Sequence, residues 1–284
     1  MARFKIGVIV DSFRVGIDEG IKKAKEIGAE GIQVYTAGGD MGPDSLTDAR
    51  IREIRDMVES NGLVISAVVG DLGGFGFTRA DENPAKIEMS RRIMENGKKL
   101  GTNIVTTHIG CIPADPNHDR RKIMQEACNQ LGTIADSLGM HFAIETGPEK
   151  CVTLKSFLDS LDCKGMGVNF DPANLVMVAD DDPAEGAKTL GKYIVHTHAK
   201  DGNLLHYVTP EAVYGYLDED QIRDVNVEKP FEEVPLGEGG VDFDRYLDAL
   251  ESIGYNGFLT IEREVGENPF ADIKKAVEFL RAKI

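Results

Sequence analysis

A short apolar run followed by a helix-like stretch recurs eight times along this 284-residue chain. Each run is rich in β-branched residues and ends in polar residues or glycine. The runs are Lys5–Val10, Gly31–Tyr35, Val64–Gly70, Asn103–Gly110, His141–Thr146, Met166–Asp171, Tyr193–Lys200 and Gly257–Glu264. Strands that alternate with helices pair in parallel through crossover connections. Eight such units predict an α/β fold, a single-domain (β/α)8 or TIM barrel over residues 1–284.

The stretches between these runs carry helix start and stop signals. They are Ile17–Ile27, Ser45–Asn61, Pro84–Leu100, Asp119–Leu138, Thr153–Leu161, Pro183–Leu190, Phe243–Ile253 and Pro269–Ala282. Glycine follows several of them and proline begins others, as suits the two ends of a helix. An open doubly wound sheet is the alternative. Its glycine fingerprint after the first strand is replaced here by Asp11-Ser12-Phe13-Arg14, so the pattern favours the barrel.

One connection is much longer than the others. From Gly202 to Gly240, about forty residues with an acidic bias stand between the seventh strand and its helix, and they include Tyr207, Tyr214 and Tyr216. Loops of this length in a compact domain are usually lids or binding surfaces. We expect the insertion at about 202–240 to act as a lid, as a contact between copies of the chain or as a plain excursion of the chain, and the sequence leaves these alternatives open.

The charge balance disfavours several classes of partner. Lys and Arg total 32 against 48 Asp and Glu, for a formal net charge of −16. Such an acidic surface repels phosphate backbones and anionic lipids, so we expect neither nucleic-acid nor membrane binding. No apolar stretch reaches the ~20 residues of a membrane-spanning helix. The four cysteines, at positions 111, 128, 151 and 163, lack CxxC spacing, and we interpret them as reduced thiols of a cytoplasmic protein.

Four consecutive strand ends carry side chains that could bind a metal, namely Glu145, Asp171, His198 and Glu262. In barrel enzymes the chemistry gathers at these ends of the strands. A carboxylate after an apolar run is costly to bury unless it is paired, hydrogen-bonded or bound to a cation. A salt bridge or a helix cap would explain any one of them and is the alternative for all four, but three carboxylates that converge on one barrel mouth would repel each other strongly unless a cation lay among them. One imidazole with three carboxylates suits Mn²⁺ first, or Mg²⁺, with Co²⁺ and Zn²⁺ as alternatives.

Five short segments carry a resemblance to a known family. They are Ile144-Glu145, Asn169-Phe170-Asp171-Pro172-Ala173-Asn174, His196-Thr197-His198-Ala199-Lys200-Asp201, Pro235-Leu236-Gly237-Glu238-Gly239 and Thr260-Ile261-Glu262-Arg263-Glu264. In order and placement they resemble the xylose isomerase-like barrel superfamily, which includes the sugar phosphate isomerase/epimerase family and AP endonuclease type 2. The resemblance covers the whole chain. It implies that Glu145, Asp171, His198 and Glu262 hold one divalent ion, and that Glu145 and Glu262 also act as acid/base groups.

The resemblance also implies a reaction type on a small-molecule sugar. Carboxylates on the fifth and eighth strands would approach a bound sugar from opposite faces, so one can remove a proton next to a carbonyl while the metal stabilises the enediolate. Return of the proton from the other side gives epimerisation, and return to the neighbouring carbon gives isomerisation. We therefore expect a metal-dependent sugar isomerase or epimerase. The alternatives are a lyase of inosose dehydratase type, which uses the same proton abstraction and then loses a hydroxyl, and a non-catalytic or nucleic-acid-directed relative.

Further residues near the strand ends are candidate substrate contacts. They are Arg14, Gln33, Phe75, His108, Asn174 and Lys200. His108 could instead be a structural histidine. Lys200 could instead form a salt bridge with Asp201 or Glu264.

The glycine-rich loop at 70–77 and the histidine His196 have less specific signals. We expect the loop to be a mobile flap that presents Phe75 or Phe77 to the apolar face of the sugar, with a plain turn as the alternative. His196 lies two residues before His198, on the same face of the strand but one layer deeper. We therefore expect it to support the site rather than to bind the metal.

At several positions this sequence departs from the residue patterns of individual branches of the family, and these departures narrow the expected reaction and substrate. The AP endonuclease branch needs additional histidines for a three-zinc cluster, whereas this chain has Val68-Val69-Gly70 and Asn174 at two of those places. The ketohexose 3-epimerase branch has a histidine in place of Asn174 and an arginine in place of Leu204. The connections after strands seven and eight, where barrels often bind phosphate, carry Glu232, Glu233, Glu238 and Glu264. We expect a non-phosphorylated sugar or keto-sugar, and a homodimer or homotetramer of the kind that family members often form.

Overall fold

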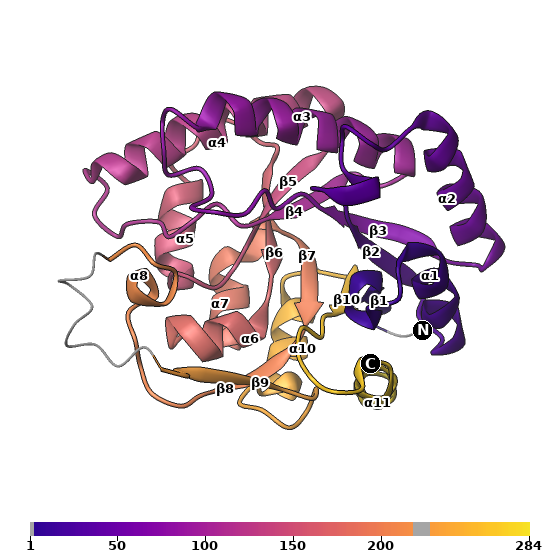
Figure 1. The fold of residues 1–284 in the computed structure, drawn as a ribbon. Coiled ribbons are helices and arrows are strands. Elements are labelled where there is room, and N and C mark those ends of the chain that lie inside the picture. The colour runs from indigo at the N-terminus through magenta and orange to yellow at the C-terminus, as the bar shows by residue number, and fades with distance from the viewer. Residues whose placement is uncertain (1–2, 218–227) are drawn as a thin grey trace.

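The computed structural model describes residues 3–217 and 228–284 and confirms the barrel (Figure 1). Eight parallel strands close on themselves in the order β1-β10-β7-β6-β5-β4-β3-β2. The strands are β1 (Lys5–Ile9), β2 (Gly31–Tyr35), β3 (Val64–Val69), β4 (Ile104–Thr107), β5 (His141–Glu145), β6 (Met166–Phe170), β7 (Ile194–Ala199) and β10 (Phe258–Ile261). Since all eight run in parallel, their carboxyl ends meet at one mouth.

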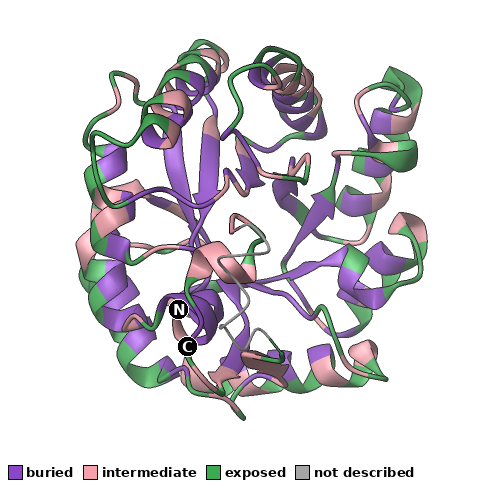
Figure 2. Ribbon diagram, turned by 60° about the vertical axis from the view of Figure 1, so that its left-hand side comes forward, coloured by how far each residue is buried: buried purple, intermediate pink, exposed green. Residues whose placement is uncertain are grey.

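Helices surround the strands, as the repeating pattern predicts. The main ones are α1 (Ile17–Glu26), α2 (Asp48–Ser60), α3 (Asn83–Leu100), α4 (Asp119–Leu138), α5 (Cys151–Leu158), α7 (Pro183–Leu190), α10 (Phe243–Ser252) and α11 (Pro269–Lys283). Figure 2 shows that they bury the faces turned toward the strands and expose the outer faces. Short 3-10 turns stand at Val10–Phe13, Gly39–Met41 and Gly191–Tyr193. No helix of the described residues is long and apolar enough to cross a membrane.

Local capping interactions set the ends of the helices, and in one case the cap explains why a helix begins at a different residue from the one that the sequence predicts. The Thr47 side chain accepts a hydrogen bond from the Arg50 amide at the start of α2, and Gly101, at a positive φ of 99°, ends α3. The helix α5 begins at Cys151 rather than at the expected Thr153. The Cys151 amide donates a 2.8 Å hydrogen bond to the Asp181 carboxylate, so a residue thirty positions away caps this helix.

A helical turn follows β6, in a segment for which the sequence analysis made no prediction. Asp171 accepts a hydrogen bond from the Asn174 amide and so caps the short α6 (Pro172–Asn174), which continues into one π-helical turn at Leu175–Ala179. Proline at the first position suits this start. The turn brings Met177 and Val178 to the barrel mouth.

The long insertion after β7 forms a small sheet of its own. The strands β8 (Asp201–Leu204) and β9 (Phe231–Val234) pair antiparallel, and a short helix α8 (Pro210–Val213) precedes β9. The Asp201 carboxylate accepts backbone hydrogen bonds from Gly202, Gly237, Gly239 and Val241, so it fixes the return of the insertion to the barrel. The part of the expected insertion from 218 to 227 lies outside the described residues.

Candidate active site

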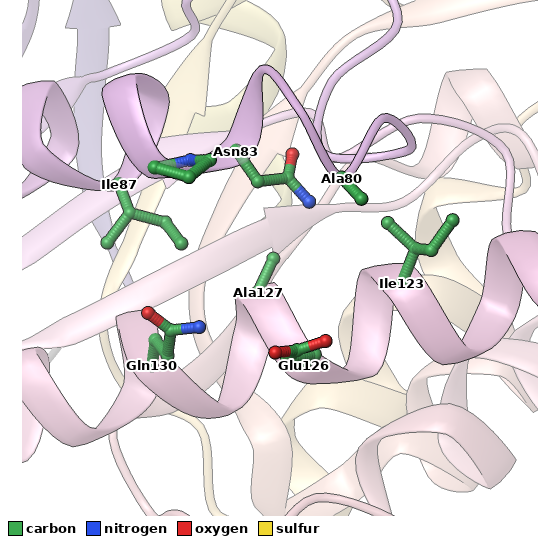
Figure 3. A pocket seen from close by; sticks show the side chains of 8 residues that line it. Ala80, Asn83, Ile87, Ile123, Glu126, Ala127 and Gln130 are labelled. Carbon is green, nitrogen blue, oxygen red and sulfur yellow. The ribbon is translucent and has the colours of Figure 1, made fainter.

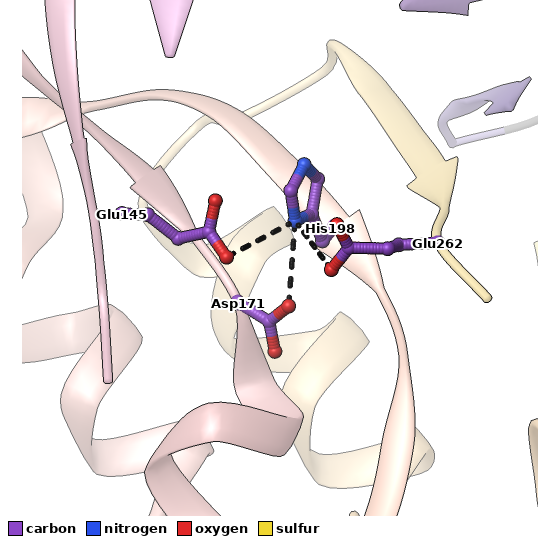
Figure 4. Close-up of side chains that lie close together, drawn as sticks. All are labelled: Glu145, Asp171, His198 and Glu262. Carbon is purple, nitrogen blue, oxygen red and sulfur yellow. Dashed lines mark hydrogen bonds and ion pairs between the residues drawn. The ribbon is translucent and has the colours of Figure 1, made fainter. Parts of the chain in front are cut away.

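The four predicted ligands converge at the barrel mouth (Figure 4). Glu145 is the last residue of β5, Asp171 directly follows β6, His198 lies in β7, and Glu262 directly follows β10. Each offers one nitrogen or oxygen ligand atom, and these four atoms lie within 4.8 Å of one another. All four residues are buried. The position of each at a strand end therefore produces one compact cluster.

One nitrogen of His198 faces all three carboxylates. Its Nδ1 lies 3.3 Å from Asp171 Oδ2, 3.4 Å from Glu262 Oε2 and 3.6 Å from Glu145 Oε1. Its Nε2 lies 3.2 Å from the amide oxygen of Gln33, which can only accept a hydrogen bond. The Gln33 oxygen therefore favours a hydrogen on Nε2, although Asn169 Nδ2 lies 3.1 Å from the same nitrogen and also bonds Glu145. With that hydrogen on Nε2, Nδ1 is the atom that either holds a proton among the carboxylates or gives its lone pair to a cation.

Gln33 was expected near a sugar hydroxyl, but it is fully buried behind His198. Its Nε2 donates to the Thr106 hydroxyl at 2.9 Å, which turns its oxygen toward the imidazole. The residue therefore orients a candidate ligand and does not line the cavity.

The pKa values of the three carboxylates in the cluster shift in different directions. Burial tends to raise the pKa of Glu262, but Lys200 and His198 outweigh it and lower this pKa to about 2. Burial likewise opposes the ionised form of Glu145, yet His108 and His198 lower its pKa well below the usual value. For Asp171, burial outweighs the neighbouring cations and its pKa is raised. A divalent cation between the oxygens would offset the negative charge of the three carboxylates, and an O,O,O,N ligand set suits such an ion.

Amide groups hold both oxygens of Glu145. Asn169 Nδ2 donates to Oε2 and Asn174 Nδ2 donates to Oε1, each at 3.1 Å. The Asn169 oxygen lies 2.9 Å from His196 Nδ1, and burial lowers the pKa of His196 to about 3, so this imidazole is neutral. His196 thus lies behind the cluster, as expected. Asn174, a predicted substrate contact, lines the cavity but already bonds the carboxylate.

Lys200 pairs with two carboxylates of the segment that follows β10. Its Nζ lies 3.0 Å from Glu262 Oε2 and also contacts Glu264. The sequence left open a salt bridge of Lys200 with Asp201 or with Glu264, and the structure has the one with Glu264. The Asp201 carboxylate instead accepts hydrogen bonds from backbone amides. The lysine is buried yet lines the cavity, so it both neutralises Glu262 and remains within reach of a ligand.

His108 forms a pair that the sequence analysis did not find. Its Nδ1 lies 3.0 Å from Asp71 Oδ2, and its Nε2 lies 3.5 Å from Glu145 Oε1. Burial would lower the pKa of His108, but Glu145 and Asp71 raise it well above the usual value. The only sequence signal for Asp71 was an acidic residue directly after the third strand.

The remaining predicted contacts lie at the edge of the site. The Arg14 guanidinium donates to the carbonyl oxygens of Glu264 and Gly266, and it lines a cavity of about 250 Å³ that Glu262 also borders. Phe75 packs against the Tyr216 ring at 5.1 Å between centroids and does not line the cavity beside the carboxylates.

The flap expectation is wrong for Phe77, which is buried in the hydrophobic core. Its amide donates to the Ile109 carbonyl at 2.9 Å, so this end of the loop is held against the connection that follows β4. Phe75 also has the Arg79 guanidinium over its ring at 4.4 Å.

A cavity of about 470 Å³ opens directly on the cluster. Glu145, Glu262, His108, Asn174 and Lys200 line it, together with apolar and aromatic side chains of the insertion and the π-helical turn. A smaller hollow of about 150 Å³ lies elsewhere, between α3 and α4, and Glu126 is the only charged residue among the described residues that line it (Figure 3). The chemistry of the described residues therefore concentrates at the barrel mouth.

Comparisons with known proteins agree with this architecture. A family model described as "Xylose isomerase-like TIM barrel" matches residues 21–283. An uncharacterized protein of Methanocaldococcus jannaschii is 26% identical over 227 residues, which are 75% of this chain and 68% of that protein. The inosose dehydratase of Bacillus thuringiensis is 25% identical over 167 residues, 56% of this chain and 53% of that enzyme. The structure of a D-psicose 3-epimerase superposes with a TM-score of 0.73 at 16% identity, over 99% of both chains, which shows a shared fold.

Proposed function

Because the chain belongs to the xylose isomerase-like TIM barrel family, we propose that it is a divalent-metal-dependent isomerase or epimerase of a non-phosphorylated sugar or keto-sugar. The observation that carries this proposal is the cluster of Glu145, Asp171, His198 and Glu262, of which Glu145 and Glu262 line a cavity of about 470 Å³. These four residues would hold the ion, and Mn²⁺ suits their donor atoms best. When bound, the ion would stabilise the negative charge that develops on the carbonyl oxygen when the neighbouring carbon loses its proton.

Glu145 and Glu262 are the proposed acid/base pair. Both pKa values are lowered, so both carboxylates are ionised near neutral pH and either can accept a proton. They come from β5 and β10, which β6 and β7 separate in the barrel order, so they reach a ligand from different sides. One would take the proton from carbon, and the other would return one on the opposite face.

The surrounding side chains would set the geometry of proton transfer. The amides of Asn169 and Asn174 fix the two oxygens of Glu145, while Lys200 fixes one oxygen of Glu262. A carboxylate with restricted rotation keeps its reacting oxygen in place. His108 and Lys200 also line the cavity, and we propose that they donate hydrogen bonds to sugar oxygens.

The charge of the cavity favours an uncharged substrate. Five glutamates line it, namely Glu145, Glu232, Glu233, Glu262 and Glu264. Its lysines are Lys200, which is already paired with Glu262 and Glu264, and Lys229, which lies 3.4 Å from Glu232. A phosphate dianion would meet net repulsion here.

A dehydratase is the second candidate, and the match to inosose dehydratases favours it. It would begin with the same proton abstraction and then expel a hydroxyl group from the next carbon. A panel of ketoses and inososes incubated with the Mn²⁺-loaded protein in D₂O separates the two. We expect deuterium at the carbon next to the carbonyl without loss of water, as read by NMR and mass spectrometry. Loss of water would favour the dehydratase, and no exchange with any substrate would contradict both.

Two further expectations stay predictions. We propose that the chain forms a homodimer or homotetramer, with the insertion at about 202–240 serving as a lid or as a contact between copies. We also propose a cytoplasmic location. In keeping with reduced thiols, none of the four cysteines is paired in a disulfide.

A further inference from the structure

A second cavity adjoins the one above the cluster. It measures about 270 Å³ and shares two wall residues, His108 and Tyr214, with the first. It extends away from the carboxylates, between the glycine-rich loop after β3, the connection after β4 and the insertion. The shared walls make the two cavities neighbouring parts of one binding region, with the reacting groups at one end.

The first cavity is already large enough for a single sugar. A hexose has twelve non-hydrogen atoms, and even at the volume of separate liquid water molecules they would fill only about 360 Å³. The first cavity measures about 470 Å³. A monosaccharide that places its carbonyl by the cluster would therefore leave the second cavity unfilled.

The lining of the second cavity suits an uncharged ring. Two tyrosines, Tyr214 and Tyr216, stand beside a proline and several glycines, and Asp71 and His108 are its charged members. These two charges satisfy each other, because Asp71 Oδ2 contacts His108 Nδ1 while Asp71 Oδ1 accepts from the Gly73 amide. An ionic group would find no free partner there, whereas an aromatic wall favours the apolar face of a ring.

The two tyrosines present different features to such a ring. The Tyr216 hydroxyl accepts from the Cys111 amide and donates to the Phe75 carbonyl, both at 3.2 Å, so its ring is fixed in place. A Cβ at Gly110 would lie 2.3 Å from that hydroxyl, so only glycine allows this position of the ring. The Tyr214 hydroxyl has no hydrogen-bond partner among residues 3–217 and 228–284, and it is available to a ligand hydroxyl.

We propose that the substrate is a glycoside, with its keto-sugar over the metal cluster and its second ring, a sugar or an aromatic aglycone, in the tyrosine-lined cavity. This inference rests on the proposed function and names the substrate class of the same site. It has a chemical consequence. The anomeric carbon carries the glycosidic bond, so the carbonyl must be a ketone on another carbon of the ring.

The test compares substrates that differ only in the second cavity. Deuterium exchange is measured with Mn²⁺-loaded protein for one ring-keto-hexopyranose as its methyl, phenyl and glucosyl glycosides. We expect kcat/KM to rise about tenfold or more from the methyl to the phenyl or glucosyl compound, since an aromatic contact and the buried ring each favour binding. Equal kcat/KM for all three would overturn the inference, whereas no exchange with any would count against the proposed function.

Three variants test whether the preference for the larger glycosides arises in the second cavity. A Cβ at Gly73 meets no atom within 4 Å, and asparagine tolerates its φ of 69°, so Gly73→Asn adds bulk to this cavity. We expect it to bring the phenyl-to-methyl ratio close to one. Tyr214→Ala removes the shared wall and should lower the same ratio, which keeps the test decisive if Gly73→Asn does not fold. Tyr207→Ala, an exposed tyrosine of the same insertion that lines neither cavity, is the control and should leave the ratio unchanged. An unchanged ratio in the folded cavity variants would contradict the assignment.

Discussion

Replacement of Gln33 by methionine should weaken metal binding while leaving the barrel folded. The Gln33 oxygen is the acceptor that keeps a hydrogen on His198 Nε2, at 3.2 Å. Asn169 Nδ2 lies 3.1 Å from the same nitrogen and can donate to it once that hydrogen is gone. Removal of the acceptor therefore favours the neutral imidazole that carries its hydrogen on Nδ1, the atom that faces the carboxylates, over the form whose Nδ1 lone pair is free for a cation. A proton on Nδ1 competes directly with a cation.

The expected loss of metal affinity follows from the role of residues that hydrogen-bond a metal-binding histidine. Residues that hold the second nitrogen of a metal-binding histidine typically contribute 10–100-fold in metal affinity. This corresponds to about 1.4–2.7 kcal/mol. Methionine has a length and volume close to those of glutamine, so the fully buried site is not left with a large cavity. We expect the Kd for Mn²⁺ to rise by about 10- to 100-fold.

The assay is a titration of the metal-free protein with Mn²⁺, followed by the EPR signal of the free ion, with thermal unfolding as the check of folding. Gln33→Glu is the matched variant, because it keeps an acceptor beside Nε2 and the Thr106 hydroxyl can turn to donate to it. It should bind Mn²⁺ far better than Gln33→Met. Wild-type affinity in a folded Gln33→Met protein, or equal losses in the two variants, would refute the reasoning.

Three further predictions concern catalysis, metal removal and pH. Glu145→Gln and Glu262→Gln should each lower exchange of the substrate proton by about 10²–10⁴-fold with little change in unfolding temperature, and full exchange in both would remove them as acid/base groups. Removal of the metal by a chelator should lower the free energy of unfolding by about 2.7 kcal/mol relative to the protein with Mn²⁺ at one hundred times its Kd. The Asp171→Asn variant should lose most of this difference in thermal unfolding, and a response identical to that of the wild type would count against Asp171 as a ligand. Burial raises the pKa of Glu149 to about 8, although the hydrogen bond from the Ile112 amide opposes the shift. The protonated carboxyl therefore contributes to the stability of the folded protein. This contribution is fully present below 4.5, the pKa of the group in the unfolded chain, and is lost as the pH rises through 8. Glu149→Gln should therefore melt like the wild type near pH 4 and at a higher temperature at pH 8.5, and parallel melting curves would disprove this.

The barrel and the four candidate ligands could be predicted because their signals are local. Each barrel strand is a short β-branched run, and each candidate ligand stands at or next to the end of one such run. Once the fold is parallel, all these ends meet at one mouth. The position in sequence therefore gives the position in space for Glu145, Asp171, His198 and Glu262.

The partners of these residues could not be predicted in the same way. Gln33 and His198 are 165 residues apart, and Asp71 and His108 come from connections after different strands. Such contacts depend on strand register and on loop paths. The π-helical turn at 175–179 was also missed, because Leu-Val-Met-Val-Ala is a β-branched apolar run with no helical period.

The Phe77 expectation failed for a related reason. In a glycine-rich loop the sequence does not set the direction of each aromatic side chain, since Gly73, Gly74 and Gly76 all adopt positive φ values. Here the chain turns Phe77 into the core and leaves Phe75 against Tyr216.

The most direct test is an anomalous difference map from a crystal of the protein soaked in Mn²⁺. We predict one peak at full occupancy, about 2.0–2.6 Å from the His198 Nδ1 atom and from one oxygen each of Glu145, Asp171 and Glu262. The absence of a peak at saturating Mn²⁺, or a peak bound by other residues, would contradict the proposed metal centre and the proton transfer that depends on it.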